Sequence, residues 1–424
     1  MANCSHNISK FLFIAILSNV LSTAQPLHAE TVFATGQAFT LREAVARAQE
    51  SAPGVQGAKA AVDSADAAVQ AARLLPNPTL SVEAENILGT GRYARFGGSE
   101  TTYSVAMPLE LGGKRSSRTR VAQAEQSAAQ IGVAVAKADL TLKITQAFIA
   151  VAASERRLRI ADQRRELAVQ TERVAHLRVG AGKVSPIDEQ RASAQRLRAD
   201  VDAGRAARAT EVARANLARL IGATQPLAIV APWFDDTSAE AGIDAPESSL
   251  SRAAAEAQVA AARARVDSAR RARIPDLTVS AGTRRIKETS DTAAVVALSI
   301  PLPLFNRGDA EVARARAELD KAEAERNAAA LDLAEALASA RADVTDARAS
   351  AISASGPELA AAQEAARIAR IGYAEGKFSQ LDLIEAERSL SQTQEAAIDA
   401  LATFHDARAR LARLLGHLDP IYKD

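Results

Sequence analysis

The sequence has a single cysteine, few aromatic residues and no excess of charge of either sign. Cys4 precedes an apolar run, where it cannot be a lipoprotein acceptor, and the chain behind that run can form neither a disulfide nor a thiolate site. The 52 basic and 51 acidic side chains lack the basic surplus that nucleic-acid binding requires. With aromatic residues at 4% and alanine dominating the apolar residues, the composition favours long, thin helical packing.

The N-terminal segment has the pattern of an export signal. Lys10 is followed by the apolar run Phe11–Leu21, and small residues precede the first acid. This pattern predicts a signal peptide over residues 1–29, cleaved at about Ala29/Glu30 and too short to span a bilayer. Its removal takes one base and no acid, which leaves 52 − 1 = 51 charges of each sign. No later apolar run is long enough for a spanning helix, so we expect a periplasmic or an outer-membrane protein, in which strands would span.

The remainder of the chain is an internal repeat. Three short segments occur twice in the same order: residues 62–65 and 266–269, 78–82 and 275–279, and 218–222 and 412–416. Such self-similarity indicates two copies of one structural unit. We expect a first repeat over 30–222, a connection over 223–250 and a second repeat over 251–424. The connection is rich in proline and acid and is predicted to lie on the surface, with Trp233 as a packing anchor.

Each copy is expected to contain a helix, two strands, a very long helix, a glycine turn and a return helix. The long helices, about 112–179 and 308–372, contain few helix breakers, and at about 1.5 Å per residue each reaches on the order of 100 Å. Bends are expected at Gly132 and at Gly356–Pro357. Because this length exceeds a globular core, the helices are predicted to pack side by side as a coiled-coil-like bundle.

Four short segments alternate apolar and polar residues, and the predicted strands are 79–86, 102–109, 276–286 and 293–301. The candidates for a lipid-facing side are Leu80, Val82, Val105, Leu277, Val279 and Leu298. A half-buried soluble hairpin shows the same alternation, but the signal peptide and the long helices favour membrane strands. Four strands cannot close a barrel, since the smallest membrane barrels have about eight, so several chains must pool their strands.

The duplicated helix–strand–strand–helix unit, the proline-marked strand ends and two Gly-x-x-Ser-x-x-Asp turns resemble the TolC family of outer-membrane efflux proteins. The segment Met107–Arg115 further resembles the heavy-metal, CzcC-like branch, the outer-membrane partners of cobalt–zinc–cadmium or nickel pumps. The resemblance implies a mainly α fold with a small β part. It also implies a homotrimer, whose pooled twelve-stranded β-barrel lies in outer-membrane lipid. A TolC-like α-helical tunnel would continue the barrel to a periplasmic adaptor and an inner-membrane proton-driven cation pump.

The two glycine turns carry most of the candidate site. Ser185-x-x-Asp188 and Ser379-x-x-Asp382 are predicted capping boxes at the starts of the return helices. The resemblance places the turns at the periplasmic tip that meets the adaptor, with the candidates Gly180, Gly182, Lys183, Ser185, Asp188, Gly376, Lys377 and Ser379. It also matches Asp382 and Glu385 to acids that ring the narrow end of the tunnel. The alternative is a helix cap and a solvated glutamate.

The sequence offers little support for metal or catalytic chemistry in the chain itself. His176, His405 and His417 are isolated from one another, and we interpret them as ordinary surface or packing residues. Gly112-Gly113-Lys114 lacks the spacing of a phosphate loop and is expected to turn a strand into a helix. With no nucleophile–base–acid set, we expect neither an enzyme nor a cofactor.

The expected function is a passive export conduit for heavy-metal cations, with energy supplied by the pump. Two alternatives stay open. One is an outer-membrane factor for drug efflux or type I protein secretion. The other is a periplasmic adaptor or coiled-coil scaffold, which two strand-bearing copies argue against.

Overall fold

The computed structural model describes residues 39–225, 228–238 and 249–422, so the expected signal peptide lies outside the described residues. Helices dominate, and the expectation of a mainly α fold with a small β part is confirmed. The first-repeat helices are α1 (Leu41–Ser51), α2 (Pro53–Arg73), α3 (Lys114–Gly180) and α4 (Pro186–Leu220). The second-repeat helices are α5 (Leu250–Ala272), α6 (Asp309–Ser353), α7 (Leu359–Ala374) and α8 (Gln380–Leu414).

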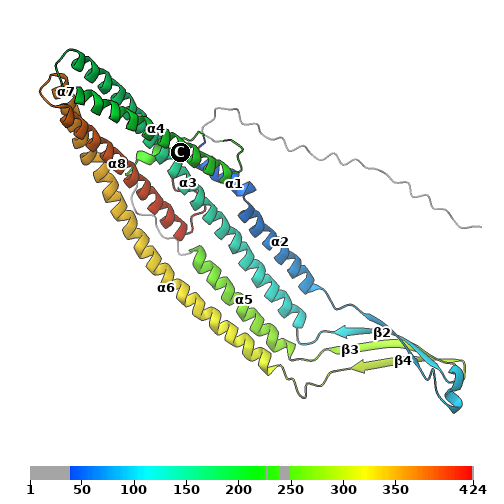
Figure 1. Cartoon of the computed structure of the whole chain (residues 1–424). Helices are drawn as coiled ribbons and strands as arrows, with labels where there is room; N and C mark the ends of the chain where they lie inside the picture. Colours follow the sequence, from blue (N-terminus) through cyan, green and yellow to red (C-terminus); the bar gives the residue numbers. More distant parts are fainter. Residues whose placement is uncertain (1–38, 226–227, 239–248, 423–424) are drawn as a thin grey trace, which may run out of the picture. The chain divides into compact units, whose positions relative to one another are not determined.

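The helix α3 organises the packing. It has 67 residues, which at about 1.5 Å each gives a length of about 100 Å. It contacts α1, α2, α4, α5 and α8, while α6 packs against α5 and α8 (Figure 1). The helix is continuous at Gly132, and no interruption of its hydrogen bonding accompanies the bend expected there.

The second long helix is interrupted at Gly356–Pro357. Residues Ala354–Glu358 form a single π-helical turn between α6 and α7. Proline has no N–H to donate, and its ring clashes with the carbonyl of the residue four positions earlier. A π-helical turn changes the hydrogen-bonding pattern at this point, and the chain resumes as α7.

The four strands form one antiparallel sheet in the order β1-β2-β3-β4. Their bounds are β1 Thr79–Glu85, β2 Glu100–Leu109, β3 Leu277–Ile286 and β4 Asp291–Ser299, and a short 3-10 helix, Gly91–Phe96, lies between β1 and β2. Central β3 requires glycine at 282, because a Cβ there would lie 2.1 Å from the carbonyl oxygen of Tyr103 on β2. Figure 1 shows β2, β3 and β4 side by side, and the strand order makes β1 and β4 the edges of the sheet.

The main core lies where α1, α3, α4, α6 and α8 meet. The connection between the repeats enters it through the short 3-10 helix Pro232–Asp235, in which Trp233 and Phe234 are buried. The Trp233 ring stacks on Tyr422 at a centroid distance of 4.1 Å, so its interpretation as a packing anchor is confirmed. The described part of the connection lies mainly on the surface, as expected, with its acids Asp235 and Asp236 exposed, although the Trp233 and Phe234 side chains are buried.

His405 of α8 is fully buried among these aromatic rings. Its Nε2 donates to the carbonyl oxygen of Phe234 at 2.9 Å, and its own carbonyl accepts from the Tyr422 hydroxyl at 2.7 Å. Burial lowers the pKa of His405 to about 4, the Phe234 carbonyl opposes this shift, and the positive charge of Arg408 adds to it. The imidazole is therefore neutral in the folded protein at neutral pH.

A neutral buried histidine makes the stability depend on pH. The imidazole titrates near 6.5 in the unfolded chain and near 4 in the folded one, so the unfolded state binds more protons between these values. We expect the free energy of unfolding to fall by about 3 kcal/mol per chain as the pH is lowered from 6.5 to 4. His405→Gln should flatten this decline, as measured by thermal unfolding followed by circular dichroism. His176→Gln, at an exposed histidine, is the control, and an equal effect of both changes would contradict the assignment.

Candidate functional site

The strand register places the six apolar candidates of the sheet on one face. Leu80 pairs with Val105, and Val105 pairs in turn with Ala281 and through it with Val296. The other four candidates follow from the same alternation: Val82, Leu277, Val279 and Leu298. Most of these side chains are exposed in the single chain. The sheet thus presents one continuous apolar face to its surroundings.

The opposite face of the sheet is polar. Ser81 and Ser104 are paired across β1 and β2, with their hydroxyl oxygens 2.8 Å apart. On the same face, the Arg284 guanidinium contacts Glu85 at 3.2 Å and Glu100 at 3.0 Å. It thereby ties three strands together by ion pairs. A sheet with one apolar and one polar face suits a boundary between an apolar medium and water.

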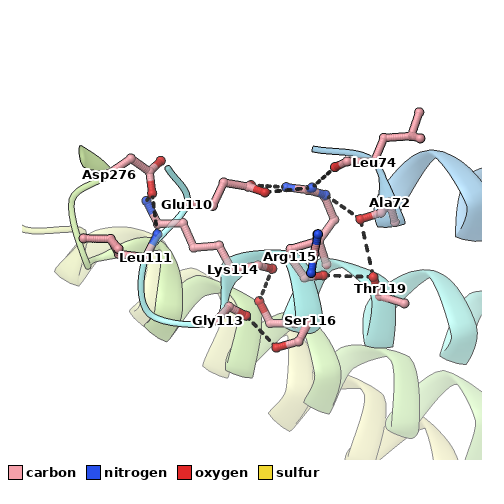
Figure 2. A network of polar contacts seen from close by, with 12 residues as sticks. Ala72, Leu74, Glu110, Leu111, Gly113, Lys114, Arg115, Ser116, Thr119 and Asp276 are labelled. Carbon is pink, nitrogen blue, oxygen red and sulfur yellow. Dashed lines mark hydrogen bonds and ion pairs between the residues drawn. The ribbon is translucent and has the colours of Figure 1, made fainter. Parts of the chain in front are cut away.

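The sheet is joined to the helices by a polar network around Arg118 of α3 (Figure 2). Arg118 donates to the carbonyl oxygens of Ala72 and Leu74, both at 3.1 Å, where α2 ends. The same guanidinium binds both carboxylate oxygens of Glu110, just after β2. One side chain therefore fixes the end of α2, the exit of β2 and the start of α3.

Gly112 and Gly113 make the turn between β2 and α3, as expected for this segment. Both have positive φ, 69° and 73°. A Cβ on Gly112 would lie 2.3 Å from Cδ1 of Ile274, so a larger residue would displace the Ile274 side chain and also strain the backbone at this positive φ. Asp276 reaches the same turn: it accepts from the backbone N–H of Leu111 at 3.2 Å, and Lys114 lies 2.8 Å from it. The Met107–Arg115 segment is thus the rigid link between sheet and helices.

The two glycine turns connect α3 to α4 and α7 to α8. Gly182 and Gly376 have φ of 67° and 75°, and both are exposed, as are Lys183 and Lys377. In each turn the residue after the glycine donates its N–H back to the preceding helix, Lys183 to Arg178 at 2.9 Å for example. This hydrogen bond gives each turn a defined C-terminal cap.

The predicted capping boxes differ between the two turns. At the start of α8, Ser379 and Asp382 form the full reciprocal box. At the start of α4, the Ser185 hydroxyl accepts from Ile187 at 3.4 Å, and the predicted box with Asp188 is wrong. The reason is that the N–H of Asp188 is already bonded to the carbonyl oxygen of Ser185 at 3.0 Å. Ser185 is still an N-cap, since a cap can serve either of two N–H groups.

Arg178 links the two turns. Its Nη2 donates to the carbonyl oxygens of Tyr373 and Ala374 at 3.0 and 3.4 Å, and its guanidinium lies 4.4 Å from the Tyr373 ring centroid. These are the last carbonyls of α7, which carry the negative end of that helix dipole. The Arg178 guanidinium therefore holds together the two turns that were predicted from the sequence.

The two acidic candidates lie on the first turns of α8. Asp382 is exposed, and its carboxylate accepts from the hydroxyl and the backbone N–H of Ser379 at 2.7 and 2.9 Å. Both hydrogen bonds, the one from the hydroxyl foremost, hold the pKa of Asp382 below its usual value. Glu385 is exposed one turn further, on the same side of the helix. Asp382 is thus a cap that remains charged at neutral pH.

The described residues lack two other classes of feature. No helix in residues 39–225, 228–238 and 249–422 is long and apolar enough to cross a membrane. Within the same ranges no group of three His, Cys, Asp or Glu side chains is placed to hold a metal ion. His176 is exposed beside Glu189 at 2.7 Å, and His405 is in the core.

The arginines that hold these sites together were not singled out from the sequence. Arg118, Arg178 and Arg284 each bind groups far away along the chain, and local patterns do not report such contacts. Only Arg178 had a local signal, because it is a basic residue in the last turn of a helix.

Comparison with known proteins agrees with this architecture. The cobalt-zinc-cadmium resistance protein CzcC of Cupriavidus metallidurans is 30% identical over 385 residues, 89% of this chain and 90% of that protein. The nickel and cobalt resistance protein CnrC of the same organism is 31% identical over 288 residues, 66% of this chain and 68% of that protein. The crystal structure of the outer membrane protein VceC from Vibrio cholerae shares the fold, with a TM-score of 0.73 at 19% identity over 89% of this chain and 96% of that chain.

These similarities confirm the resemblance to the TolC family and to its heavy-metal branch. The model of the outer membrane efflux proteins matches residues 44–223 and 244–417, nearly the whole described chain. The match includes both copies of the repeat and therefore both strand pairs and both turns. The chain belongs to the outer membrane efflux protein family.

Proposed function

We propose that the chain is the outer-membrane channel of a tripartite efflux system for heavy-metal cations, a passive conduit and not an enzyme. The observation that carries this proposal is the open four-stranded sheet with one apolar and one polar face, joined rigidly to very long helices. The cargo is inferred from the metal-resistance relatives, one of which matches the chain almost end to end. Drug efflux and type I secretion are not favoured by these relatives.

The channel is a homotrimer in this proposal. The described part of one chain has four strands and a sheet with two unpaired edges, and three copies supply twelve strands for a closed barrel. The apolar face then meets outer-membrane lipid and the polar face, with Ser81 and Arg284, lines the water-filled lumen. An exported leader, cleaved at about Ala29/Glu30, fits this location.

The glycine turns are the proposed contact for a periplasmic adaptor, which connects the channel to an inner-membrane proton-driven pump. The turns are exposed, capped and fixed to one another by Arg178, and such a rigid surface loses little entropy on binding. The proposed contact residues are Gly180, Gly182, Lys183, Ser185, Asp188, Gly376, Lys377 and Ser379.

Asp382 and Glu385 are the proposed acidic ring at the narrow end of the tunnel. Three chains would contribute six carboxylates to a small aperture, which attracts cations and repels anions. Glu385 is the better probe of this idea, because Asp382 is also a helix cap.

The cargo is tested by deletion of the gene and growth on graded cobalt, nickel, zinc and cadmium. We expect a several-fold lower inhibitory concentration for at least one cation, because the pump then lacks its exit. Return of the intact gene is the control and should restore growth. Unchanged tolerance to all four cations contradicts the heavy-metal assignment and leaves the fold intact.

The apolar face is tested with adjacent residues of β1. Val82→Arg places a charge on the apolar face and should cost about 2–4 kcal/mol per chain near the middle of a bilayer. Val279→Arg should act in the same way. The control, Ser81→Arg, changes the polar face and should be tolerated better. The measurement is the amount of detergent-stable trimer in the outer-membrane fraction, and equal losses for both faces would speak against a membrane sheet.

The aperture is tested by single-channel recording under a salt gradient. Glu385→Gln removes a charge without touching the cap, so cation selectivity should fall while the trimer stays intact, and adding Asp382→Asn should lower it further. Asp188→Asn, at the matching position of the first turn, is the control. An unaltered reversal potential in an intact trimer leaves Asp382 as a cap only, and loss of the trimer means that the pair is structural.

A further inference from the structure

A short segment after β4 exposes several large apolar side chains. Residues 300–305 read Ile-Pro-Leu-Pro-Leu-Phe. Leu302 is 74% exposed, Leu304 is 69% exposed, and the Phe305 ring is completely exposed in the single chain. Large apolar side chains gathered in this way mark an interaction surface.

The segment is held in place at several points. The N–H of Leu304 donates to the carbonyl oxygen of Leu302 at 2.9 Å, which makes a tight turn at Pro303. Beyond Phe305, the carbonyl oxygen of Arg307 accepts from Arg273 of the α5 end at 3.1 Å, and Arg273 also pairs with Asp309. The apolar side chains are therefore presented on a supported turn.

A second exposed apolar pair lies on the other edge of the sheet, before β1. Leu74 is 67% exposed and Leu75 is 57% exposed. The backbone here is also fixed, because Arg118 donates to the carbonyl oxygen of Leu74. Figure 2 shows the Leu74 side chain directed away from the polar network.

The order of the sheet brings these two surfaces together when copies assemble, and this step rests on the proposed trimer. All neighbouring strands are antiparallel, so β1 and β4 run in opposite directions and β4 of one copy can pair antiparallel with β1 of the next. In that pairing the end of β4 at Ser299 lies beside the start of β1 at Thr79. Segment 300–305 then comes beside residues 74–78 of the next copy.

Prolines decide what kind of contact forms there. Pro301 and Pro303 follow β4, and Pro76 and Pro78 precede β1. Since proline has no N–H, neither segment can continue a regular ladder of hydrogen bonds. The backbone pairing therefore stops on both sides at the same level, and side chains make the contact beyond it.

We propose that Leu302, Leu304 and Phe305 of one copy pack on Leu74 and Leu75 of the next copy. This packing forms an apolar clasp at the level where the sheet joins the helices. The two partners are Arg-supported segments on opposite edges of the same sheet, so the contact is head to tail and closes when the ring of copies closes. The clasp fixes each sheet and each helix bundle to the next copy.

Engineered cysteines test the clasp in a Cys4→Ser background, so that uncleaved precursor contributes no native thiol either. Leu74→Cys or Leu75→Cys is combined with Leu302→Cys or Phe305→Cys, and outer-membrane fractions are treated with an oxidant or a short bismaleimide. Covalent dimers and trimers are expected from at least one pairing. The control combines Phe305→Cys with Leu88→Cys, which is more exposed than Leu74 and Leu75 but lies beyond the other end of β1, and should stay monomeric on the gel.

A third pair separates failure of the clasp from failure of the channel. Thr79→Cys with Ser299→Cys reports closure of the sheet between copies. If this pair crosslinks and none of the four clasp pairings does, the clasp is wrong and the proposed channel stands. Lipid or another protein then covers residues 300–305. If neither crosslinks and the chain sediments as a monomer, the proposed function fails together with the clasp.

Discussion

The unpaired edges of the four-stranded sheet are the constraint on which the rest of the structure depends. Backbone groups within a bilayer must find partners inside the protein, because no water is available there. Within residues 39–225, 228–238 and 249–422 of one chain, no strand pairs with the outer sides of β1 and β4. If β4 of each copy pairs with β1 of the next, the backbone groups of both edges gain hydrogen-bond partners. Assembly then depends on the position of every helix relative to the sheet.

Arginine side chains that bind the ends of helices fix the helices relative to the sheet and to one another. Arg118 binds the last carbonyls of α2, Arg178 those of α7, and Arg273 the chain before α6. Helix C-termini carry carbonyl groups without intrahelical partners and a partial negative charge. A guanidinium donates hydrogen bonds to these carbonyls and also neutralises part of the negative charge. A protein with few aromatic residues therefore fixes these connections with guanidinium groups, and it packs the rings of Phe148, Phe234 and Tyr422 around Trp233 in the core.

Local periodicity explains how much the sequence could predict. Alternation along the strands was enough to assign the shared face of Val82, Val105 and Val279, because neighbouring side chains in a strand point to opposite sides. Contacts between distant segments had no such signal. The burial of Trp233 and Phe234 in an acidic connection depends on α8, and the hydrogen bonds of Arg178 depend on the end of α7. Sequence patterns thus predicted elements and faces, and the ties between them came from the structure.

The π-helical turn at Gly356–Pro357 has a consequence for the phase of the long helix. Buried positions on α6 alternate steps of four and three, at Ala340, Val344, Ala347 and Ala351. Continuation of that rhythm would bury Ala365, Ile368 and Gly372, whereas α7 buries Ala366, Ala369 and Gly372, so the first two buried positions come one residue later. The wider turn absorbs one extra residue. The extra residue at this turn thus allows α6 and α7 to pack against the same helix, α8, although their buried positions are spaced differently along the sequence.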